Sequence, residues 1–250
     1  MGIVFGFTNF IIVYMYQIIL LFLLLTFPAM ASDYNLYKPN NYSVKNPDLS
    51  ERILFILDYS NSMNEYLDGK RKVELMIDTM RSILPKLDPS VSVGLRVYGH
   101  RMGFTPIDSC RASSLIEPIS LNNMQNINIS LSQLSPRGMT PITYSLKQAV
   151  RKDFLGFNGK KHIILLTDGG ENCDESPCKY VMELIKIRKD IIIDVIAFDI
   201  DNEDDLSQLE CTSLVTNGKF YNAQTAAELV KSLNNSVNTI KNVEAKIFKN

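Results

Sequence analysis

The sequence has no excess of positive or of negative charge. Its 250 residues include 26 Lys and Arg and 27 Asp and Glu, which gives a formal net charge of -1. The chain also has no arginine-rich run and no basic stripe. Binding to nucleic acid or to an anionic membrane surface depends on such basic clusters, so neither is expected as a partner of the domain.

Charge is missing altogether from residues 1–31. The apolar run Ile11–Phe27 is followed by small residues at Ala29 and Ala31, the pattern of a signal-peptidase site, so we expect a cleaved signal and a mature start at Ser32. The positive amino end of a signal is lacking, and the run nearly spans a bilayer, so an uncleaved membrane anchor, or a shorter signal from Met15, stays open. Either way the domain is expected outside the cytoplasm, periplasmic, secreted or membrane-anchored.

Histidine is scarce, whereas cysteine is present in an even number. The four cysteines are Cys110, Cys173, Cys178 and Cys211. In an exported protein they predict two disulfides, for which three connectivities are possible. The spacing of Cys173 and Cys178 also allows a zinc site, but neither His100 nor His162 lies near them in the sequence, so zinc is the less favoured interpretation.

After a polar, aperiodic linker at residues 32–50, apolar strands alternate with amphipathic helices. Strands are expected at 52–58, 91–98, 115–119, 162–167, 191–198 and 218–222, and helices at 70–87, 123–134, 141–152, 178–189, 203–210 and 226–240. The central strands are apolar on both faces, which is typical of a parallel sheet covered by helices. We therefore predict one doubly wound α/β domain at residues 51–241, with helices on both faces of a mostly parallel sheet, one short antiparallel edge strand, and a tail at 242–250.

The first predicted strand ends in a group of oxygen-bearing side chains. Five apolar residues, Ile53 to Leu57, are followed by Asp58 and then by Ser60 and Ser62. Ligands of open α/β sheets bind at the carboxyl ends of strands, and carboxylate and hydroxyl oxygens are ligands of a hard cation such as Mg²⁺. On these residues alone, an Asp that caps the next helix beside two loop serines is an equal alternative.

Two further segments are expected at the same edge of the sheet. Thr140 follows a turn and precedes a helix, and Asp168 lies in a Thr-Asp-Gly sequence after the apolar strand 162–167. With these residues the sequence resembles the von Willebrand factor A domain family, whose metal-ion-dependent adhesion site combines D-x-S-x-S, a middle-loop Thr and the Asp of T-D-G. The resemblance covers residues 52–240.

The resemblance implies a role for each residue of the site. Ser60 and Ser62 would ligate Mg²⁺ directly, with Mn²⁺ or Ca²⁺ as other possible cations. Thr140 would ligate it in a ligand-bound state, and Asp58 and Asp168 would act directly or through water. The edge is expected to be exposed to solvent, so Asp58→Ala should abolish magnesium binding and leave the fold intact.

The resemblance extends to a subgroup of exported bacterial members of the family. The matching segments are Tyr98–Arg101, Cys110, Ser135–Ile142, Asp168–Cys173, Pro177–Cys178, Cys211 and Gly218–Tyr221. The family's sheet order puts Cys110 and Cys211 on opposite sides of the metal site, which favours the pairs Cys110–Cys173 and Cys178–Cys211. A local Cys173–Cys178 bridge is the competing connectivity.

The resemblance implies a non-enzymatic module that binds a protein ligand through an exposed Asp or Glu of that ligand. A metal-dependent hydrolase at the same edge and a structural subunit of an envelope assembly are the alternatives. The sequence argues against a hydrolase, because Asp58 is followed by Tyr59 rather than forming a D-x-D pair, and because no glycine-rich phosphate loop is present.

Other polar residues near this edge have two interpretations each. His100 and Arg101 could contact an acidic partner or, as we favour, hydrogen-bond neighbouring loops. Glu171 could reach the metal through water or only cap its loop. The acidic residues at 199–205 are expected to be a solvated helix start rather than a calcium site.

Overall fold

The computed structural model describes residues 51–247. The predicted signal and linker, residues 1–50, lie outside the described residues, as do residues 248–250. The main sheet has the order β5-β4-β1-β6-β7-β8, and all neighbouring strands are parallel except β4 and β5. The strands are β1 (Arg52–Asp58), β4 (Ser92–Tyr98), β5 (Ser113–Ser120), β6 (Lys161–Thr167), β7 (Ile191–Phe198) and β8 (Phe220–Ala223). This arrangement confirms the predicted fold class.

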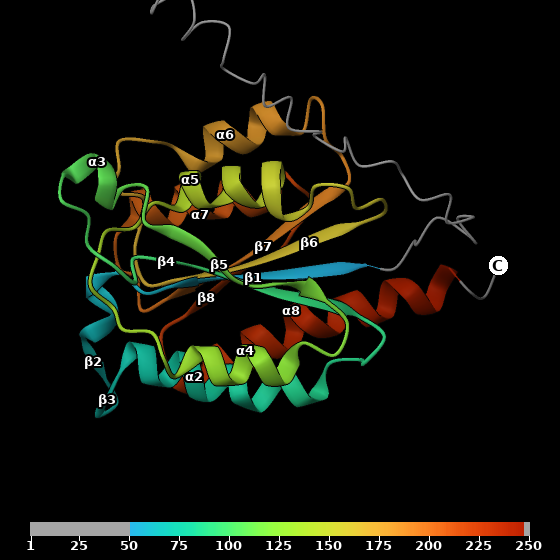
Figure 1. Cartoon of the computed structure of the whole chain (residues 1–250), viewed down its shortest axis with the longest axis horizontal. Coiled ribbons are helices and arrows are strands. Elements are labelled where there is room, and N and C mark those ends of the chain that lie inside the picture. The colour runs from blue at the N-terminus through green and yellow to red at the C-terminus, as the bar shows by residue number, and fades with distance from the viewer. Residues whose placement is uncertain (1–50, 248–250) are drawn as a thin grey trace, which may run out of the picture. The chain divides into compact units, whose positions relative to one another are not determined.

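Helices cover both faces of the sheet (Figure 1). The helices on one face are α2 (Lys72–Ile83), α4 (Met124–Leu131) and α8 (Ala226–Ile247). The helices on the other face are α5 (Ile142–Gln148), α6 (Pro177–Leu184) and α7 (Glu203–Leu214). Because helices enclose the sheet on both faces, every residue of β1, β4 and β6 is buried.

The strand β1 supplies side chains to two separate apolar cores. Phe55 and Leu57 pack with residues of α2, α4 and α8, whereas Leu54 and Ile56 pack with residues of α5, α6 and α7. Each such side chain contributes about 1.5–3 kcal/mol by leaving water. The core therefore fixes β1 rigidly, and with it the loop that follows Asp58.

Several elements differ in detail from the sequence prediction. A hairpin of β2 (Tyr66–Leu67) and β3 (Lys70–Arg71) precedes α2, with Asp68 and Gly69 at positive φ in its turn. The helix α2 therefore begins at Lys72 rather than at residue 70, and it gives way to the 3-10 turn η2 (Leu84–Lys86). Asp-Gly favours a two-residue hairpin turn, which accounts for the later start.

The other differences are short additional elements and changed helix ends. The short 3-10 turn η1 (Asn61–Asn64) follows β1, and the loop after β4 contains a short helix, α3 (Pro106–Ser109). A π-helical turn, η3 (Ala149–Asp153), continues α5. The helix α8 extends to Ile247, so much of the predicted tail at 242–250 is helical. Within the described residues, no helix combines the length and apolarity needed to cross a membrane.

Two disulfides lie beside the carboxyl ends of the strands. Cys110 pairs with Cys173 and Cys178 pairs with Cys211, with Cα–Cα distances of 5.5 Å and 5.4 Å. This is the pairing favoured by the family's sheet order, and the local Cys173–Cys178 bridge and the zinc interpretation are excluded because all four sulfurs are used. Two disulfides indicate an oxidising compartment outside the cytoplasm.

Candidate metal centre

The carboxyl ends of the parallel strands form one side of the sheet, which we call the carboxyl edge. Asp58 lies at its centre and is fully buried, so the prediction that this residue is exposed to solvent is wrong. Its Oδ1 accepts a hydrogen bond from the Ser60 backbone N–H at 2.6 Å. Its Oδ2 accepts hydrogen bonds from the hydroxyls of Tyr98 at 3.0 Å and Thr167 at 2.8 Å. Burial raises the pKa of Asp58, and these hydrogen bonds oppose the rise. The neighbouring strands β4 and β6 thus cover the carboxylate from both sides.

Ser60, Ser62 and Asp168 form a continuous chain of oxygen atoms. Ser60 Oγ and Ser62 Oγ are 3.0 Å apart, and Ser62 Oγ donates to Asp168 Oδ1 at 2.7 Å. Burial, and then the charge of Asp58, raise the pKa of Asp168 to about 7. Asp168 Oδ2 is buried and accepts no hydrogen bond within the described residues. This oxygen has a charged neighbour, the ammonium of Lys72 at 3.4 Å, but lacks the hydrogen bond that buried polar groups usually have.

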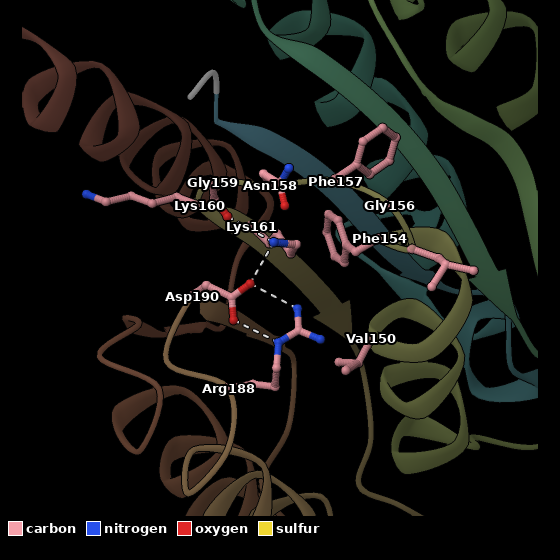
Figure 2. A pocket seen from close by; sticks show the side chains of 11 residues that line it. Val150, Phe154, Gly156, Phe157, Asn158, Gly159, Lys160, Lys161, Arg188 and Asp190 are labelled. Carbon is pink, nitrogen blue, oxygen red and sulfur yellow. Dashed lines mark hydrogen bonds and ion pairs between the residues drawn. The ribbon is translucent and has the colours of Figure 1, made fainter. Parts of the chain in front are cut away.

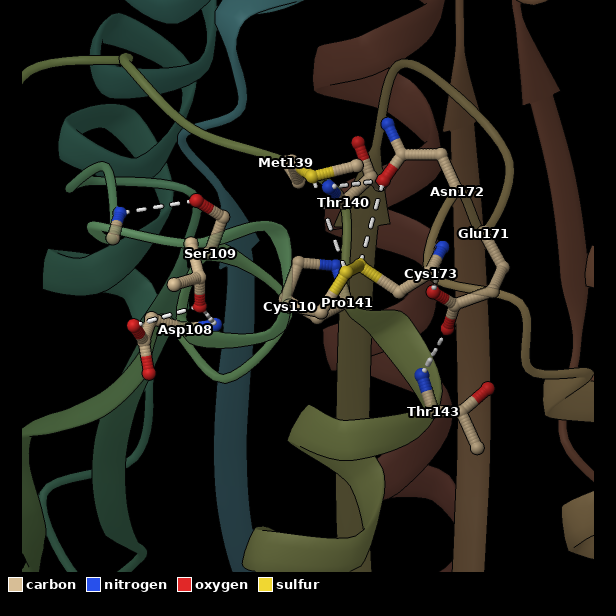
Figure 3. Close-up of a disulfide and its surroundings, with 12 residues drawn as sticks. Asp108, Ser109, Cys110, Met139, Thr140, Pro141, Thr143, Glu171, Asn172 and Cys173 are labelled. Atoms are coloured by element: carbon tan, nitrogen blue, oxygen red, sulfur yellow. Dashed lines mark hydrogen bonds between the residues drawn. A yellow bond between two sulfur atoms is a disulfide. The ribbon is translucent and has the colours of Figure 1, made fainter.

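The loop that carries Thr140 lies directly against the loop that carries Ser60. The Asn61 N–H donates to Gly138 O at 2.9 Å, and Ser60 and Gly138 form an isolated parallel bridge. Thr140 is buried, and its backbone N–H donates to Asn172 Oδ1 at 2.7 Å, next to the Cys110–Cys173 disulfide (Figure 3). Three segments that are far apart in the sequence are therefore adjacent at this edge.

Two glycines make this close approach possible. Gly99 has φ of +70°, and a Cβ there would lie 2.5 Å from the Ser60 backbone nitrogen. A Cβ on Gly138 would lie 2.6 Å from the carbonyl oxygen of Arg101. Any side chain at either position would push the loop after β4 away from the loops that carry Ser60 and Thr140.

Lys72 is a residue of this edge that sequence reasoning missed. Its side chain is only 5% exposed, and its Nζ lies 2.9 Å from Asp199 Oδ2, 3.1 Å from Glu65 Oε2 and 3.4 Å from Asp168 Oδ2. Burial by itself lowers the pKa of Lys72, but hydrogen bonds to Asp199 and Glu65 outweigh it and raise the pKa above its usual value. In the sequence Lys72 follows Lys70 and Arg71, and nothing in that run indicates which cation is buried.

The structure also decides between the two interpretations of Glu171. Its Oε2 accepts from the Thr143 N–H at 2.7 Å, and its Oε1 accepts from the Cys173 N–H at 3.0 Å (Figure 3). Both oxygens are therefore engaged in fixing the loop and the start of α5. Burial raises the pKa of this carboxyl above its usual value. His100 is half-buried, and no hydrogen bond from the described residues reaches its buried Nδ1, so the favoured loop contact is not made at that atom.

The acidic segment after β7 is largely a helix start. The side chain of Asn202 caps α7 by accepting from the N–H groups of Asp204 and Asp205 at 2.9 Å and 3.0 Å. Asp199 is the exception, because it turns toward Lys72. Asp58, Asp168 and Asp199, at the ends of β1, β6 and β7, thus lie at the same edge of the sheet, and the ammonium of Lys72 contacts the last two.

The donor set at this edge suits a hard cation better than a soft one. Within residues 51–247, no group of three or more His, Cys, Asp or Glu side chains could hold a metal ion. A cation here would therefore depend on the hydroxyls of Ser60, Ser62 and Thr140 as well as on carboxylates. Oxygen-only donors and the hydrogen-bond-free Asp168 Oδ2 fit Mg²⁺, Mn²⁺ or Ca²⁺ rather than a thiolate or imidazole metal.

A separate pocket of about 460 Å³ lies at the opposite end of the strands, around the start of β6 (Figure 2). Three of its charged side chains pair: Lys161 Nζ lies 2.6 Å from Asp190 Oδ2, and Arg188 Nε lies 2.8 Å from Asp190 Oδ1. The hydrogen bond from Arg188 is the main reason that the pKa of Asp190 falls below its usual range.

A model of the von Willebrand factor type A domain matches residues 53–236. The chain belongs to the von Willebrand factor type A domain family. This match spans the whole sheet and includes the positions of Asp58, Ser60, Ser62, Thr140 and Asp168.

The chain is also similar to a curated protein and to solved structures. The uncharacterized protein YwmD of Bacillus subtilis (strain 168) is 29% identical over 196 residues, 76% of this chain and 85% of YwmD. Proximal thread matrix protein 1 from the mussel byssus, with a zinc-occupied MIDAS motif, has a TM-score of 0.58 at 20% identity over 75% of this chain. The pilus adhesin SpaC of Lactobacillus rhamnosus GG has a TM-score of 0.60 at 16% identity over 76% of this chain.

The similarity covers less than half of each of the two solved chains. The present chain spans 45% of the mussel chain and 30% of the SpaC chain. At these identities the similarity shows the fold alone. The family model therefore establishes the family, and the solved structures agree with the fold.

Proposed function

We propose that this chain is a non-enzymatic binding module that binds a divalent cation and captures a protein ligand through it. Mg²⁺ is the cation that we propose, ahead of Mn²⁺ and Ca²⁺. The residues that would hold the cation are Asp58, Ser60, Ser62, Thr140 and Asp168. When bound, the cation supplies a positive centre at which a carboxylate of the partner, from Asp or Glu, can replace a water. Ser60 and Ser62 would contribute hydroxyl oxygens, and Thr140 would join in the ligand-bound state.

One observation carries this proposal. Ser60, Ser62 and Asp168 come from loops 106 residues apart, yet they are linked by contacts of 3.0 Å and 2.7 Å, and they end in a buried carboxylate oxygen without a hydrogen bond. Helix capping does not require such a convergence, because each of these loops has other polar groups that could cap it. The alternative of an Asp that only caps the next helix is therefore not favoured.

The contacts of Asp58 argue against hydrolysis at this edge. A nucleophilic carboxylate needs an oxygen that can approach the substrate. Both oxygens of Asp58 are instead engaged by Ser60, Tyr98 and Thr167, and the residue is fully buried. We therefore assign Asp58 the task of fixing the Ser60 loop and supplying negative charge, directly or through water, to the cation.

The proposal includes an extracytoplasmic location. Two disulfides support it, and so does the uncharged apolar segment at residues 1–31. A cleaved signal gives a periplasmic or secreted protein, and an uncleaved one gives a membrane-anchored protein. Sequencing the amino terminus of the natural protein distinguishes the two, because a start at Ser32 requires cleavage.

The experiment that tests the proposal is calorimetric titration with Mg²⁺. Because Asp58 is buried, Asp58→Asn is a better variant than Asp58→Ala: it keeps the shape, and the hydroxyls of Tyr98 and Thr167 can reorient toward an amide. We expect Asp58→Asn to lose magnesium binding while it unfolds cooperatively, as the wild type does. Asp201→Asn, an exposed carboxylate on the same edge, is the matched control and should bind as the wild type does.

Thr140→Ala separates cation binding from ligand capture. The variant should still bind Mg²⁺, because the other donors remain, but it should bind a carboxylate ligand less well. Equal magnesium affinity in the wild type and Asp58→Asn would mean that the cation is bound elsewhere or not at all.

A further inference from the structure

The loop between β4 and β5 exposes large apolar side chains next to the candidate metal centre. Phe104 has a relative exposure of 107%, Met102 of 73% and Ile107 of 64%. Large apolar side chains exposed together on one loop are typical of an interaction surface. We call these three residues, together with Arg101, Arg111 and Arg137, the loop surface.

The loop surface is rigidly held. Thr105 Oγ1 caps α3 by accepting from the Asp108 N–H at 3.1 Å, and Ser109 Oγ accepts from the Gly103 N–H at 3.0 Å. The Cys110–Cys173 disulfide ties the end of the loop to the segment after β6. The apolar side chains are therefore exposed by an ordered loop, which reduces the entropy lost on binding.

Backbone contacts place the arginines of the loop surface beside the candidate metal centre. Arg137 donates its N–H to Tyr59 O at 3.2 Å and to Gly99 O at 3.0 Å. Arg101 packs its carbonyl against Gly138, two residues before Thr140. Arg111 lines a hollow of about 340 Å³ together with Met102, Phe104 and Asp108. It also lines a hollow of about 260 Å³ together with Ile107 and the acidic residues Glu171, Asp174 and Glu175. The apolar and basic groups thus form one surface.

Three arginines outnumber Asp108, the one carboxylate that lines the hollow of Met102 and Phe104, so this side of the edge is net positive. The side chains of Arg101, Arg111 and Arg137 are exposed and have no ion-pair partner among the described residues. On the other side, around the start of α7, the exposed carboxylates are those of Asp201, Glu203 and Asp204. An acidic partner segment is attracted to the loop surface, whereas a basic one is repelled from it.

We propose that the loop surface binds the acidic and apolar residues that flank the metal-bound Asp or Glu of a protein ligand. The inference rests on the proposed cation-dependent capture and specifies its partner: a segment with one carboxylate for the cation, an aromatic or aliphatic residue against Phe104 and Met102, and a second acid against the arginines. Cation coordination supplies the anchor, and the loop surface supplies the selectivity among acidic ligands.

The test uses a phage-displayed random 12-mer peptide library, selected on the immobilised chain in Mg²⁺ and eluted with EDTA. We expect eluted peptides to share an acid with an apolar residue and a second acid close by. Their affinity, measured by fluorescence anisotropy, should fall at least about tenfold in Phe104→Ser and in Arg101→Glu, the size of effect typical of one important interface residue.

Matched controls lie at the opposite end of the strands. Leu155 is 77% exposed there, and Arg151 is exposed on η3 nearby, so Leu155→Ser and Arg151→Glu repeat the same chemical changes away from the edge. Both controls should bind the peptides as the wild type does.

The outcomes separate the inference from the function on which it rests. EDTA-eluted peptides that bind Phe104→Ser and Arg101→Glu as tightly as the wild type would overturn the role of the loop surface and leave cation-dependent capture standing. Peptides that resist EDTA yet lose binding in Phe104→Ser would overturn the cation capture and support the loop surface. A dimer of the wild type that dissociates in Phe104→Ser, seen by analytical ultracentrifugation, would identify the occupant as a second copy and overturn the proposed ligand.

Discussion

Replacing Lys72 by methionine should tighten magnesium binding at the candidate metal centre. The ammonium of Lys72 lies 3.4 Å from Asp168 Oδ2, the carboxylate oxygen that we propose for the cation. It therefore neutralises part of the charge that a cation would use, and it repels that cation directly. Methionine has a similar length and fills the same space without the charge.

The contacts of Lys72 set the expected magnitude. Two unit charges 4 Å apart interact by about 4 kcal/mol at the effective dielectric constant of about 20 found near protein surfaces. The ammonium is shared among the carboxylates of Asp168, Asp199 and Glu65, and solvent reaches Glu65, whose side chain is 66% exposed. A third to a half of the full value is a reasonable net effect, about 1.4–2 kcal/mol, or about 10- to 30-fold in affinity.

The assay is calorimetric titration with Mg²⁺ at low ionic strength, together with the shift in melting temperature that Mg²⁺ produces. Without cation the variant should be less stable than the wild type, because Asp168 loses its counter-ion in a buried place, so added Mg²⁺ should stabilise the variant more. Lys70→Met is the control, since Lys70 is 57% exposed and its one ion-pair partner among the described residues is Asp78. Magnesium affinity that is unchanged or weaker in Lys72→Met would refute the reasoning.

Two further predictions concern stability. Arg96→Met should cost about 3–5 kcal/mol in urea unfolding, because the buried Asp153 loses contacts of 2.6 Å and 2.7 Å, and a second change of Asp153→Leu should recover much of the loss. Burial alone lowers the pKa of His162, but hydrogen bonds to Asp194 and Glu51 outweigh burial and raise it above 6.5. Protonated His162 therefore stabilises the fold fully below pH 6.5, and this stabilisation is lost as the pH rises through the pKa of the folded state. The stability advantage of the wild type over His162→Gln should therefore be larger at about pH 5.5 than at about pH 9.

The sequence was sufficient to predict the sheet and the grouping of the site loops. The runs that become β1, β6 and β7 are apolar on both faces and end in polar residues, so a parallel sheet with its polar strand ends at one edge was the natural interpretation. The hairpin at Asp68 and Gly69 was missed although Asp-Gly favours such turns, because its strands are only two residues long and show no alternation.

Burial at the site could not be predicted in the same way. Asp58 is covered by Tyr98 and Thr167, which belong to the strands on either side, and only the sheet order brings them together. Lys72 is buried because the hairpin directs the start of α2 toward Asp168 and Asp199. Such features depend on tertiary contacts rather than on local pattern, and they determine the electrostatics of the site.

The formal charges at this edge explain why capture should depend steeply on the cation. Asp58, Asp168, Asp199 and Glu65 bring up to four negative charges to the centre and Lys72 brings one positive charge, so the centre without a cation is net negative and repels an acidic ligand. A bound divalent cation places two positive charges at the point where the ligand carboxylate would bind. Only then do the arginines of the loop surface and the centre attract the same ligand. A chelator should therefore leave a centre that repels the acidic segment which the arginines still attract, rather than merely weakening one contact.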